Sequence, residues 1–242
     1  MIAKFSEAFR LLGHHLGLFT AIILTLWLPG NILVDYVASN VNRSSNTGFM
    51  GLMKMTMWIE GIFGPIYIGA LVYALFQIKS GRTVTYKEAI AIGFKKWGSL
   101  FAARFVAGIL IGLGSVALVI PGVILAVRYS LLDPAVIIEG RGTSESRARS
   151  TELTVGRRWQ IFWAAVLFFV PYMILCTAID LPLGFIESLD IMPVEVVLDC
   201  ILDIAFAVIQ IVLFLFYWEA TQDQRHAEPC APPNRDPLRG SR

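Results

Sequence analysis

Long runs of apolar residues, separated by short polar segments, make up most of this 242-residue chain. A helix needs about 20 apolar residues to cross a hydrocarbon core roughly 30 Å thick, and six runs reach about that length. Lipid-exposed backbone must satisfy its own hydrogen bonds, so each run is predicted to be a helix. The sequence predicts one integral membrane domain, residues 1–224, with spans at about 16–37, 53–78, 100–119, 121–139, 160–179 and 194–218.

The third and fourth runs are joined only by the corner Ile120-Pro121-Gly122, which carries no charge. Proline is favoured in the first turn of a helix, because the N–H that it lacks would have no partner there. We therefore expect a tight helical hairpin in which Pro121 opens the returning helix. Ahead of the third run, Thr85 and Glu88 form a capping-box pattern that begins a helix.

Composition narrows the class of protein. Apolar residues make up 56% of the chain and charged residues 16%, whereas soluble domains carry about 25% charged residues. This composition therefore favours a membrane protein over a water-soluble fold. Cys176, Cys200 and Cys230 lack the spacing of metal ligands. No HExxH, GxSxG or phosphate-binding glycine loop is present, so the sequence predicts no enzyme, no metal or cofactor and no nucleic-acid partner.

Basic residues are concentrated in alternate loops, and this asymmetry orients a membrane protein because basic loops stay in the cytoplasm. The opposite loops are polar or acidic apart from Arg43. Both termini are therefore predicted to be cytoplasmic. The basic set comprises Lys4, Arg10, Lys79, Arg82, Lys87, Lys95, Lys96, Arg104, Arg141, Arg147, Arg149, Arg157, Arg158, Arg225, Arg235, Arg239 and Arg242.

A short pattern recurs ahead of three runs, as LGHHLGLF (12–19), GFKKWGSLF (93–101) and VGRRWQIF (155–162). Each copy has a glycine, a basic or histidine pair and a bulky apolar residue before the run begins. The chain is therefore predicted to be an all-α, six-span protein of three units, each an amphipathic helix followed by a two-span hairpin. His14 and His15 replace the basic pair in the first copy, which makes them interface residues rather than metal ligands.

The last segment differs in composition from the rest of the chain. Residues 225–242 contain four prolines and few large apolar residues. Such a segment does not bury enough apolar surface to offset the entropy of ordering it. It is predicted to be a disordered cytoplasmic tail.

Arg128 lies inside the fourth run, where a charge costs roughly 2.5–3.5 kcal/mol on insertion scales. Asp199 and Asp203 share one face of the sixth run because they are four residues apart. At 1.5 Å per residue from the outer ends of the two runs, Arg128 and Asp199 lie roughly 10 Å deep and Asp203 roughly 15 Å deep. We therefore expect Arg128 to pair with one or both aspartates, either as a structural clasp or in a transport or relay role.

Two further acids, Glu60 and Asp133, also fall at membrane depth. Glu60 lies in a glycine-broken stretch, and Asp133 precedes Pro134, which disfavours continuous helix at that point. Acids on broken helices can line a water-filled ion path. The alternative is that each acid is a local cap or lies in the interface, an interpretation that is favoured for Glu60 and left open for Asp133.

Basic residues beside the amphipathic segments are candidates for contact with anionic phospholipids. Each such charge is worth about 1 kcal/mol near an anionic membrane surface. The alternative is that these residues only enforce topology. The residues concerned are Lys87, Lys95, Lys96, Arg157 and Arg158.

The stretch from Ile120 to Phe162 carries a more specific pattern. Its members are Pro121-Gly122, Arg128-Tyr129, Pro134, Glu139-Gly140, Ser150 and the glycine with a basic pair at 156–158. In these residues the chain resembles the membrane domain attached to some bacterial glycerophosphodiester phosphodiesterases, and related six-span inner-membrane proteins of unknown function.

That resemblance implies an inner-membrane location and a link to phospholipid or envelope biology. It does not imply phosphodiesterase activity, because that chemistry belongs to a separate soluble barrel domain in the fused enzymes. The sequence thus favours a non-enzymatic membrane module that organises lipid or supports partner proteins. The alternative is a small transporter in which Glu60, Asp133, Asp199 and Asp203 line a polar path.

Overall fold

The computed structural model describes residues 2–40, 46–183 and 192–227, and within this part of the chain every element is a helix. The all-α fold class is therefore confirmed. The helices are α1 (Ile2–His14), α2 (Leu16–Asn40), α3 (Asn46–Lys79), α4 (Tyr86–Ala117), α5 (Val119–Tyr129), α6 (Leu132–Ile137), α7 (Thr143–Leu153), α8 (Arg158–Leu183) and α9 (Met192–Ala227).

Six helical segments in the described chain are long and apolar enough to cross a membrane, and each overlaps one predicted span. Large apolar side chains cover their outer surfaces; Val116 is 88% exposed and Trp159 is 73% exposed. Continuous exposed apolar surface on this scale marks contact with a membrane. The six segments are Leu16–Val34, Lys54–Lys79, Tyr86–Ala117, Val119–Ile137, Arg158–Ile179 and Val196–His226.

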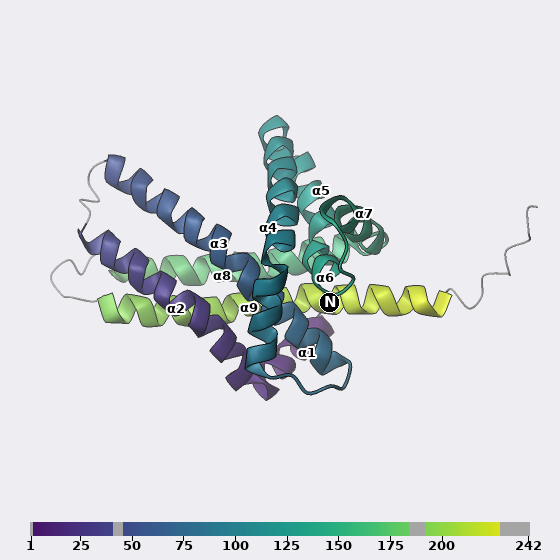
Figure 1. Cartoon of the computed structure of the whole chain (residues 1–242). Helices are drawn as coiled ribbons and strands as arrows, with labels where there is room; N and C mark the ends of the chain where they lie inside the picture. Colours follow the sequence, from purple (N-terminus) through teal and green to yellow (C-terminus); the bar gives the residue numbers. More distant parts are fainter. Residues whose placement is uncertain (1, 41–45, 184–191, 228–242) are drawn as a thin grey trace, which may run out of the picture.

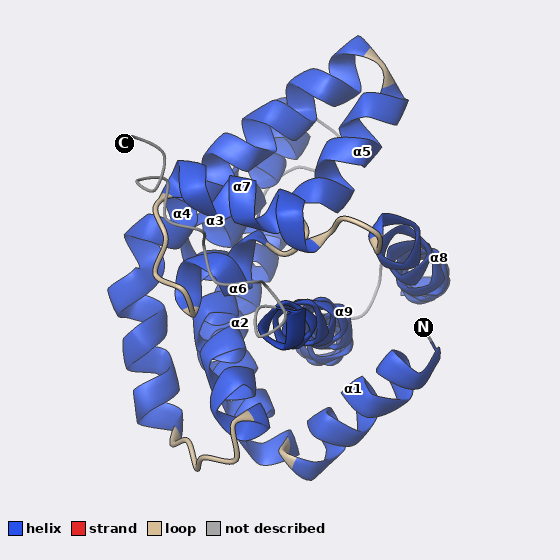
Figure 2. Ribbon diagram, turned by 90° about the vertical axis from the view of Figure 1, so that its right-hand side faces the viewer, coloured by secondary structure: helices blue, strands red, loops and turns tan. Residues whose placement is uncertain are grey.

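The long helices do not all run in one direction. Helices α2, α3, α8 and α9 lie roughly along one axis, and the α4–α5 hairpin crosses them (Figure 1). A quarter turn shows α8 and α9 end-on while α4 and α5 extend across the view (Figure 2). Helix α9 contacts α1, α2, α3, α7 and α8, and its stretch between Ala207 and Ala220 supplies much of the buried core.

The α4–α5 hairpin turns more sharply than the sequence predicted. The turn is the single extended residue Leu118, and Pro121 and Gly122 already lie in the first turn of α5. Gly122 is required there because a Cβ would stand 2.8 Å from the Cα of Ser115. At Gly114, a Cβ would come within 3.3 Å of Gly122, so these two glycines let the helices cross closely.

The predicted fourth span, 121–139, is two helices rather than one. Helix α5 ends at Tyr129 and α6 begins at Leu132. The hydroxyl of buried Ser150, on α7, donates to the carbonyl of Arg128 (2.8 Å) and accepts from the N–H of Leu131 (3.1 Å). This satisfies backbone groups that the break leaves unpaired. Pro134 follows in the first turn of α6, where its missing N–H is tolerated.

The three predicted amphipathic segments are helical, but each joins the following helix differently. A turn at His15 separates α1 from α2, and residues 154–157, with Gly156 at φ +77°, separate α7 from α8. The middle segment instead continues straight into the third span as the 32-residue α4. The Thr85–Glu88 capping box that begins it is confirmed. The three-unit repeat itself stays a prediction.

The ends of the predicted spans also shift. Helix α9 continues to Ala227, so the first three residues of the predicted tail are helical. The remainder of that tail, 228–242, lies outside the described residues, as do 41–45 and 184–191, which hold Arg43, Glu187 and Asp190 of the predicted outer loops.

Candidate functional site

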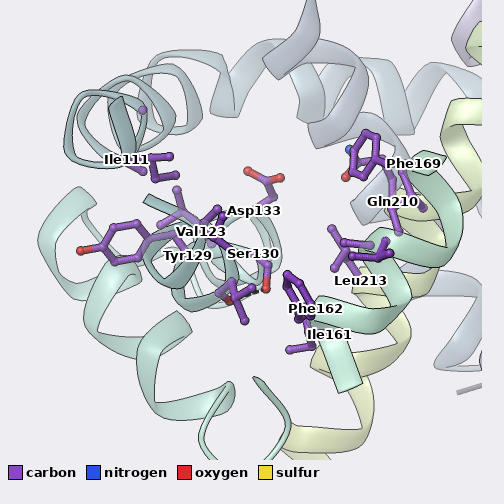
Figure 3. Close-up of a pocket in the computed structure, with 18 of the residues that line it drawn as sticks. Ile111, Val123, Tyr129, Ser130, Asp133, Ile161, Phe162, Phe169, Gln210 and Leu213 are labelled. Carbon is purple, nitrogen blue, oxygen red and sulfur yellow. Dashed lines mark hydrogen bonds between the residues drawn. The ribbon is translucent and has the colours of Figure 1, made fainter. Parts of the chain in front are cut away.

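A cavity of about 610 Å³ opens between the α4–α5 hairpin and helices α6, α8 and α9 (Figure 3). We call it the hairpin cavity. Most of its walls are apolar, and Val123, Phe169 and Val170 at its edge are also exposed on the outer surface. Its lining residues with polar groups are Arg104, Tyr129, Ser130, Asp133 and Gln210.

The hairpin cavity contains one ion pair, between Arg104 on α4 and Asp133 on α6. The Nε of Arg104 lies 3.0 Å from Oδ1 of Asp133, whose residue is 8% exposed. The pair is not aligned as a hydrogen bond, and this Oδ1 has no hydrogen-bond partner among the described residues. A buried carboxylate with an unfilled acceptor is destabilising unless another donor reaches it. Asp133 is therefore an incompletely satisfied carboxylate in the wall of the cavity.

The opposite wall supplies a second polar group, the amide of Gln210 on α9. Gln210 is only 9% exposed, and its side chain makes no hydrogen bond to another described residue. Asp133 and Gln210 come from different walls, with apolar Val123, Phe162 and Leu213 around them (Figure 3). The cavity thus combines apolar walls with a small polar centre, the usual composition of a ligand site.

The predicted pairing of Arg128 with Asp199 or Asp203 is wrong. Among the described residues Arg128 forms no ion pair, and its buried Nε has no hydrogen-bond partner. The depth estimate assumed that the fourth and sixth spans lie side by side, whereas α5 packs against α4, α7 and α8 and the hairpin crosses the direction of α9 (Figure 1). The hairpin arginine that does pair with an acid is Arg104, which contacts Asp133 on α6 and which the sequence analysis had assigned only to topology.

The aspartates of α9 lie in a different polar contact. Asp203 accepts a hydrogen bond from the amide of Asn31 on α2, at 2.9 Å. Asp199 lies one turn earlier on α9 and is half-buried, and Glu60 on α3 is exposed. None of these three acids lines the hairpin cavity. The structure therefore separates the predicted intramembrane charge cluster into the Asp133 pair and the Asp203 contact.

The five basic residues predicted to contact anionic lipid have different surroundings. Lys87 and Lys95 are exposed, while Lys96 is half-buried and its Nζ would lie 3.6 Å from a Cβ at Gly140. Arg157 forms an ion pair with Asp223 on α9. Arg158 lines a neighbouring cavity of about 580 Å³, which shares Phe162 with the hairpin cavity, and its buried Nε has no partner among the described residues. Their contact with lipid stays a prediction.

Sequence reasoning missed a polar network around Glu139, just beyond α6. The carboxylate accepts hydrogen bonds from Arg149 at 3.1 Å, from the hydroxyl of Tyr217 at 3.0 Å, and from Arg141. Burial raises the pKa of Glu139, but these hydrogen bonds outweigh it, so the pKa falls below its ordinary value of 4.5. The same network raises the pKa of Arg149, whose burial acts in the opposite direction. Glu139-Gly140 stood out in the family resemblance, but nothing in the sequence indicated its partners.

Comparison with known proteins supports the membrane assignment. The chain is 23% identical over 192 residues to a UPF0259 membrane protein of Yersinia pestis (strain Pestoides F), and equally to one of Yersinia pseudotuberculosis serotype O:1b (strain IP 31758). Each match covers 78% of this chain and 72% of the relative. No family model matches the chain, and no solved structure matches it. With its six apolar helices, the chain is a multi-pass membrane protein.

Proposed function

We propose that this chain is a non-enzymatic, lipid-binding module of the bacterial inner membrane, with both termini in the cytoplasm. The hairpin cavity holds one membrane lipid, or an amphiphile of similar chemistry, and thereby organises the bilayer beside the hairpin. The observation that carries the proposal is a single charged pair, Arg104–Asp133, in a mostly apolar cavity whose edge meets the lipid-facing surface.

The size and chemistry of the hairpin cavity support an amphiphilic ligand. Its volume of about 610 Å³ falls within the roughly 300–1,000 Å³ of small-molecule sites. Apolar chains would contact Val123, Phe162 and Phe169. The polar head would lie against Asp133 and Gln210, which have hydrogen-bonding capacity that no described residue uses. A purely apolar ligand would leave those groups unsatisfied.

The distribution of charge supports the proposed orientation. Basic residues gather where α3 and α9 end and where α7 begins and ends: Lys79 is the last residue of α3, Arg225 lies in the last turn of α9, and Arg141, Arg149 and Arg157 lie just before, within and just after α7. The segments that join α2 to α3 and α8 to α9 are polar or acidic in sequence apart from Arg43. Positive loops are retained in the cytoplasm.

Two glycines on α4 provide a matched test. Gly108 lines the hairpin cavity, whereas Gly112, one turn further along, does not. A Cβ at either position would meet nothing within 4 Å, so Gly108→Phe fills the cavity and Gly112→Phe adds the same side chain outside it. The lipid that stays with the full chain after purification in a mild nonionic detergent is measured by mass spectrometry.

We expect wild type and Gly112→Phe to retain close to one lipid per chain, and Gly108→Phe to lose most of it. Equal retention by all three proteins would contradict the proposal. Equal thermal stability of the two variants shows that a loss of lipid is not a loss of fold.

One observation favours the alternative of a small transporter. Asp203 and Asn31 form a polar contact within the spans, and Cys200 Sγ lies 4.0 Å from the same Asn31 amide. In a hydrated path, a water-soluble maleimide would label Cys200 rapidly in native membranes, although the residue is only 7% exposed. Absence of labelling until the protein is denatured favours the lipid-binding module.

A further inference from the structure

A further cavity, of about 470 Å³ and with a largely polar lining, lies where α3, α6, α7 and α9 meet. Three arginines from three separate parts of the chain line this cavity. Glu139 is the one acidic residue among the described residues that line it. We call it the arginine cavity. Its lining also includes an aromatic and hydroxyl-bearing wall from α9, namely Tyr217, Trp218, Thr221 and Gln224, besides Arg141, Arg149 and Arg225.

Glu139 holds the arginines in place rather than neutralising them all. Its two oxygens accept from Arg149, Arg141 and Tyr217, so its acceptor sites are largely used. Gly140, at φ +67°, adopts a backbone conformation that other residues rarely adopt, and it lets the chain turn between Glu139 and Arg141. The acid therefore fixes the positions of two guanidinium groups beside the cavity.

The arginines keep donors that no described residue uses. The Nε of Arg141 donates a hydrogen bond to Glu139, and the two terminal nitrogens of Arg141 make no hydrogen bond within the described chain. Arg225, in the last turn of α9, has neither an ion pair nor a hydrogen bond to a described residue. Three arginines against one carboxylate leave the lining with a net charge of +2. Lys96, close to Gly140, adds a further cation beside it.

We propose that the arginine cavity binds a phosphate group through Arg141 and Arg225, with Arg149 held behind them by Glu139. A guanidinium presents planar, paired N–H donors that match the oxygens of phosphate. The hydroxyl of Thr221 and the amide of Gln224 line the same wall and can add neutral donors. The phosphate belongs either to a phospholipid head or to a soluble phosphate compound.

The course of α9 links this site to the hairpin cavity. Gln210 and Leu213 line the hairpin cavity, and Tyr217 and Thr221 line the arginine cavity. These residues follow one another on one face of the helix because they are three or four positions apart. Gln210 and Tyr217 are roughly 10 Å apart along the axis. The phosphate site does not depend on a lipid in the hairpin cavity, but a phospholipid could occupy both.

The test uses the full chain in nonionic detergent micelles and three probes. These are inorganic phosphate, dioleoylphosphatidylglycerol and dioleoylglycerol, which has the same chains without phosphate. Affinity is measured by microscale thermophoresis for wild type, Arg225→Gln and Arg141→Gln. Arg82→Gln is the matched control, since Arg82 is an exposed arginine in the loop between α3 and α4 and lines neither cavity.

We expect Arg225→Gln to weaken binding of phosphatidylglycerol about tenfold, the loss typical of one charge-assisted hydrogen bond. Arg82→Gln should leave the affinity within about twofold, as for surface changes generally. Because Arg225 has no partner to lose, this variant does not threaten the fold. Saturable binding of inorganic phosphate identifies the phosphate itself as the ligand, and binding of phosphatidylglycerol alone identifies a lipid head. Either result, with the loss in Arg225→Gln, supports the site.

Equal weakening by Arg225→Gln and Arg82→Gln would overturn the proposal, because the effect would then be one of overall charge. Absence of saturable binding of both phosphate probes would also overturn it. Dioleoylglycerol separates this outcome from failure of the lipid-binding function. Its binding should respond to Gly108→Phe in the hairpin cavity and not to Arg225→Gln.

Discussion

Asp133 and Glu139 lie six residues apart, at opposite ends of the short helix α6, yet their surroundings differ. Asp133 faces an apolar cavity, with one ion pair that is not aligned as a hydrogen bond. Glu139 lies beyond the apolar segment and accepts hydrogen bonds from two arginines and a tyrosine. The saturated acid stabilises the protein and positions its neighbours, whereas the unsaturated acid keeps an acceptor for a ligand.

The largest effect is expected from Glu139→Gln. The substitution removes the charge that Arg141 and Arg149 share and weakens hydrogen bonds to both. We expect a loss of about 2 kcal/mol of unfolding free energy, since hydrogen bonds to charged groups are worth about 1.5–3 kcal/mol each and the site is partly hydrated. Thermal unfolding in detergent measures it. Glu145→Gln, an exposed acid on α7, is the control and should change little.

Acidification should act on the same network with a smaller effect. The pKa of Glu139 is lowered in the folded protein, so its contribution to stability is complete well above 4.5 and is lost as the pH falls through the folded pKa. Wild type should therefore lose stability relative to Glu139→Gln below this range. Parallel stability profiles for the two proteins between pH 6 and about pH 3 would contradict the assigned hydrogen bonds.

A smaller loss is expected when the pair in the hairpin cavity is broken. Arg104 is 37% exposed at its side chain and can turn away, so Asp133→Asn should cost about 1 kcal/mol, less than the 3–5 kcal/mol of a fully buried pair. A double-mutant cycle with Arg104→Gln measures the coupling. If the coupling energy between Asp133 and Arg104 exceeded that between Glu139 and Arg149, Asp133 rather than Glu139 would be the acid that stabilises the fold.

The smallest effect is expected at Arg128. Because it forms no ion pair among the described residues, Arg128→Gln breaks none and should lower the unfolding free energy by less than about 0.5 kcal/mol. A loss as large as that of Glu139→Gln would show that Arg128 has a carboxylate partner after all. The two hairpin arginines, Arg104 and Arg128, would then have to exchange roles.

The sequence predicted what depends on local pattern. Six apolar runs, the hairpin and the Thr85–Glu88 capping box follow from neighbouring residues, and the structure confirms them. The break between α5 and α6 at Ser130 does not follow from neighbouring residues, because Ser150 on α7 stabilises it. The crossing of the hairpin over the long helices does not follow from local pattern either, and the depth comparison between Arg128 and Asp199 had assumed parallel spans (Figure 1). A count from the turn at Leu118 would have been more informative, since Arg104 lies fourteen residues before it and Asp133 fifteen after it.

Photo-crosslinking shows directly whether a lipid occupies the hairpin cavity beside Asp133. A benzoylphenylalanine probe replaces Phe169, which lines the cavity, or Trp163, which is exposed on α8 but does not. The detergent-purified full chain is irradiated and analysed by mass spectrometry. A lipid adduct is expected at position 169 and should be abolished by Gly108→Phe, whereas little adduct is expected at position 163. Equal adducts at both positions, or an adduct at 169 that persists in Gly108→Phe, would contradict it.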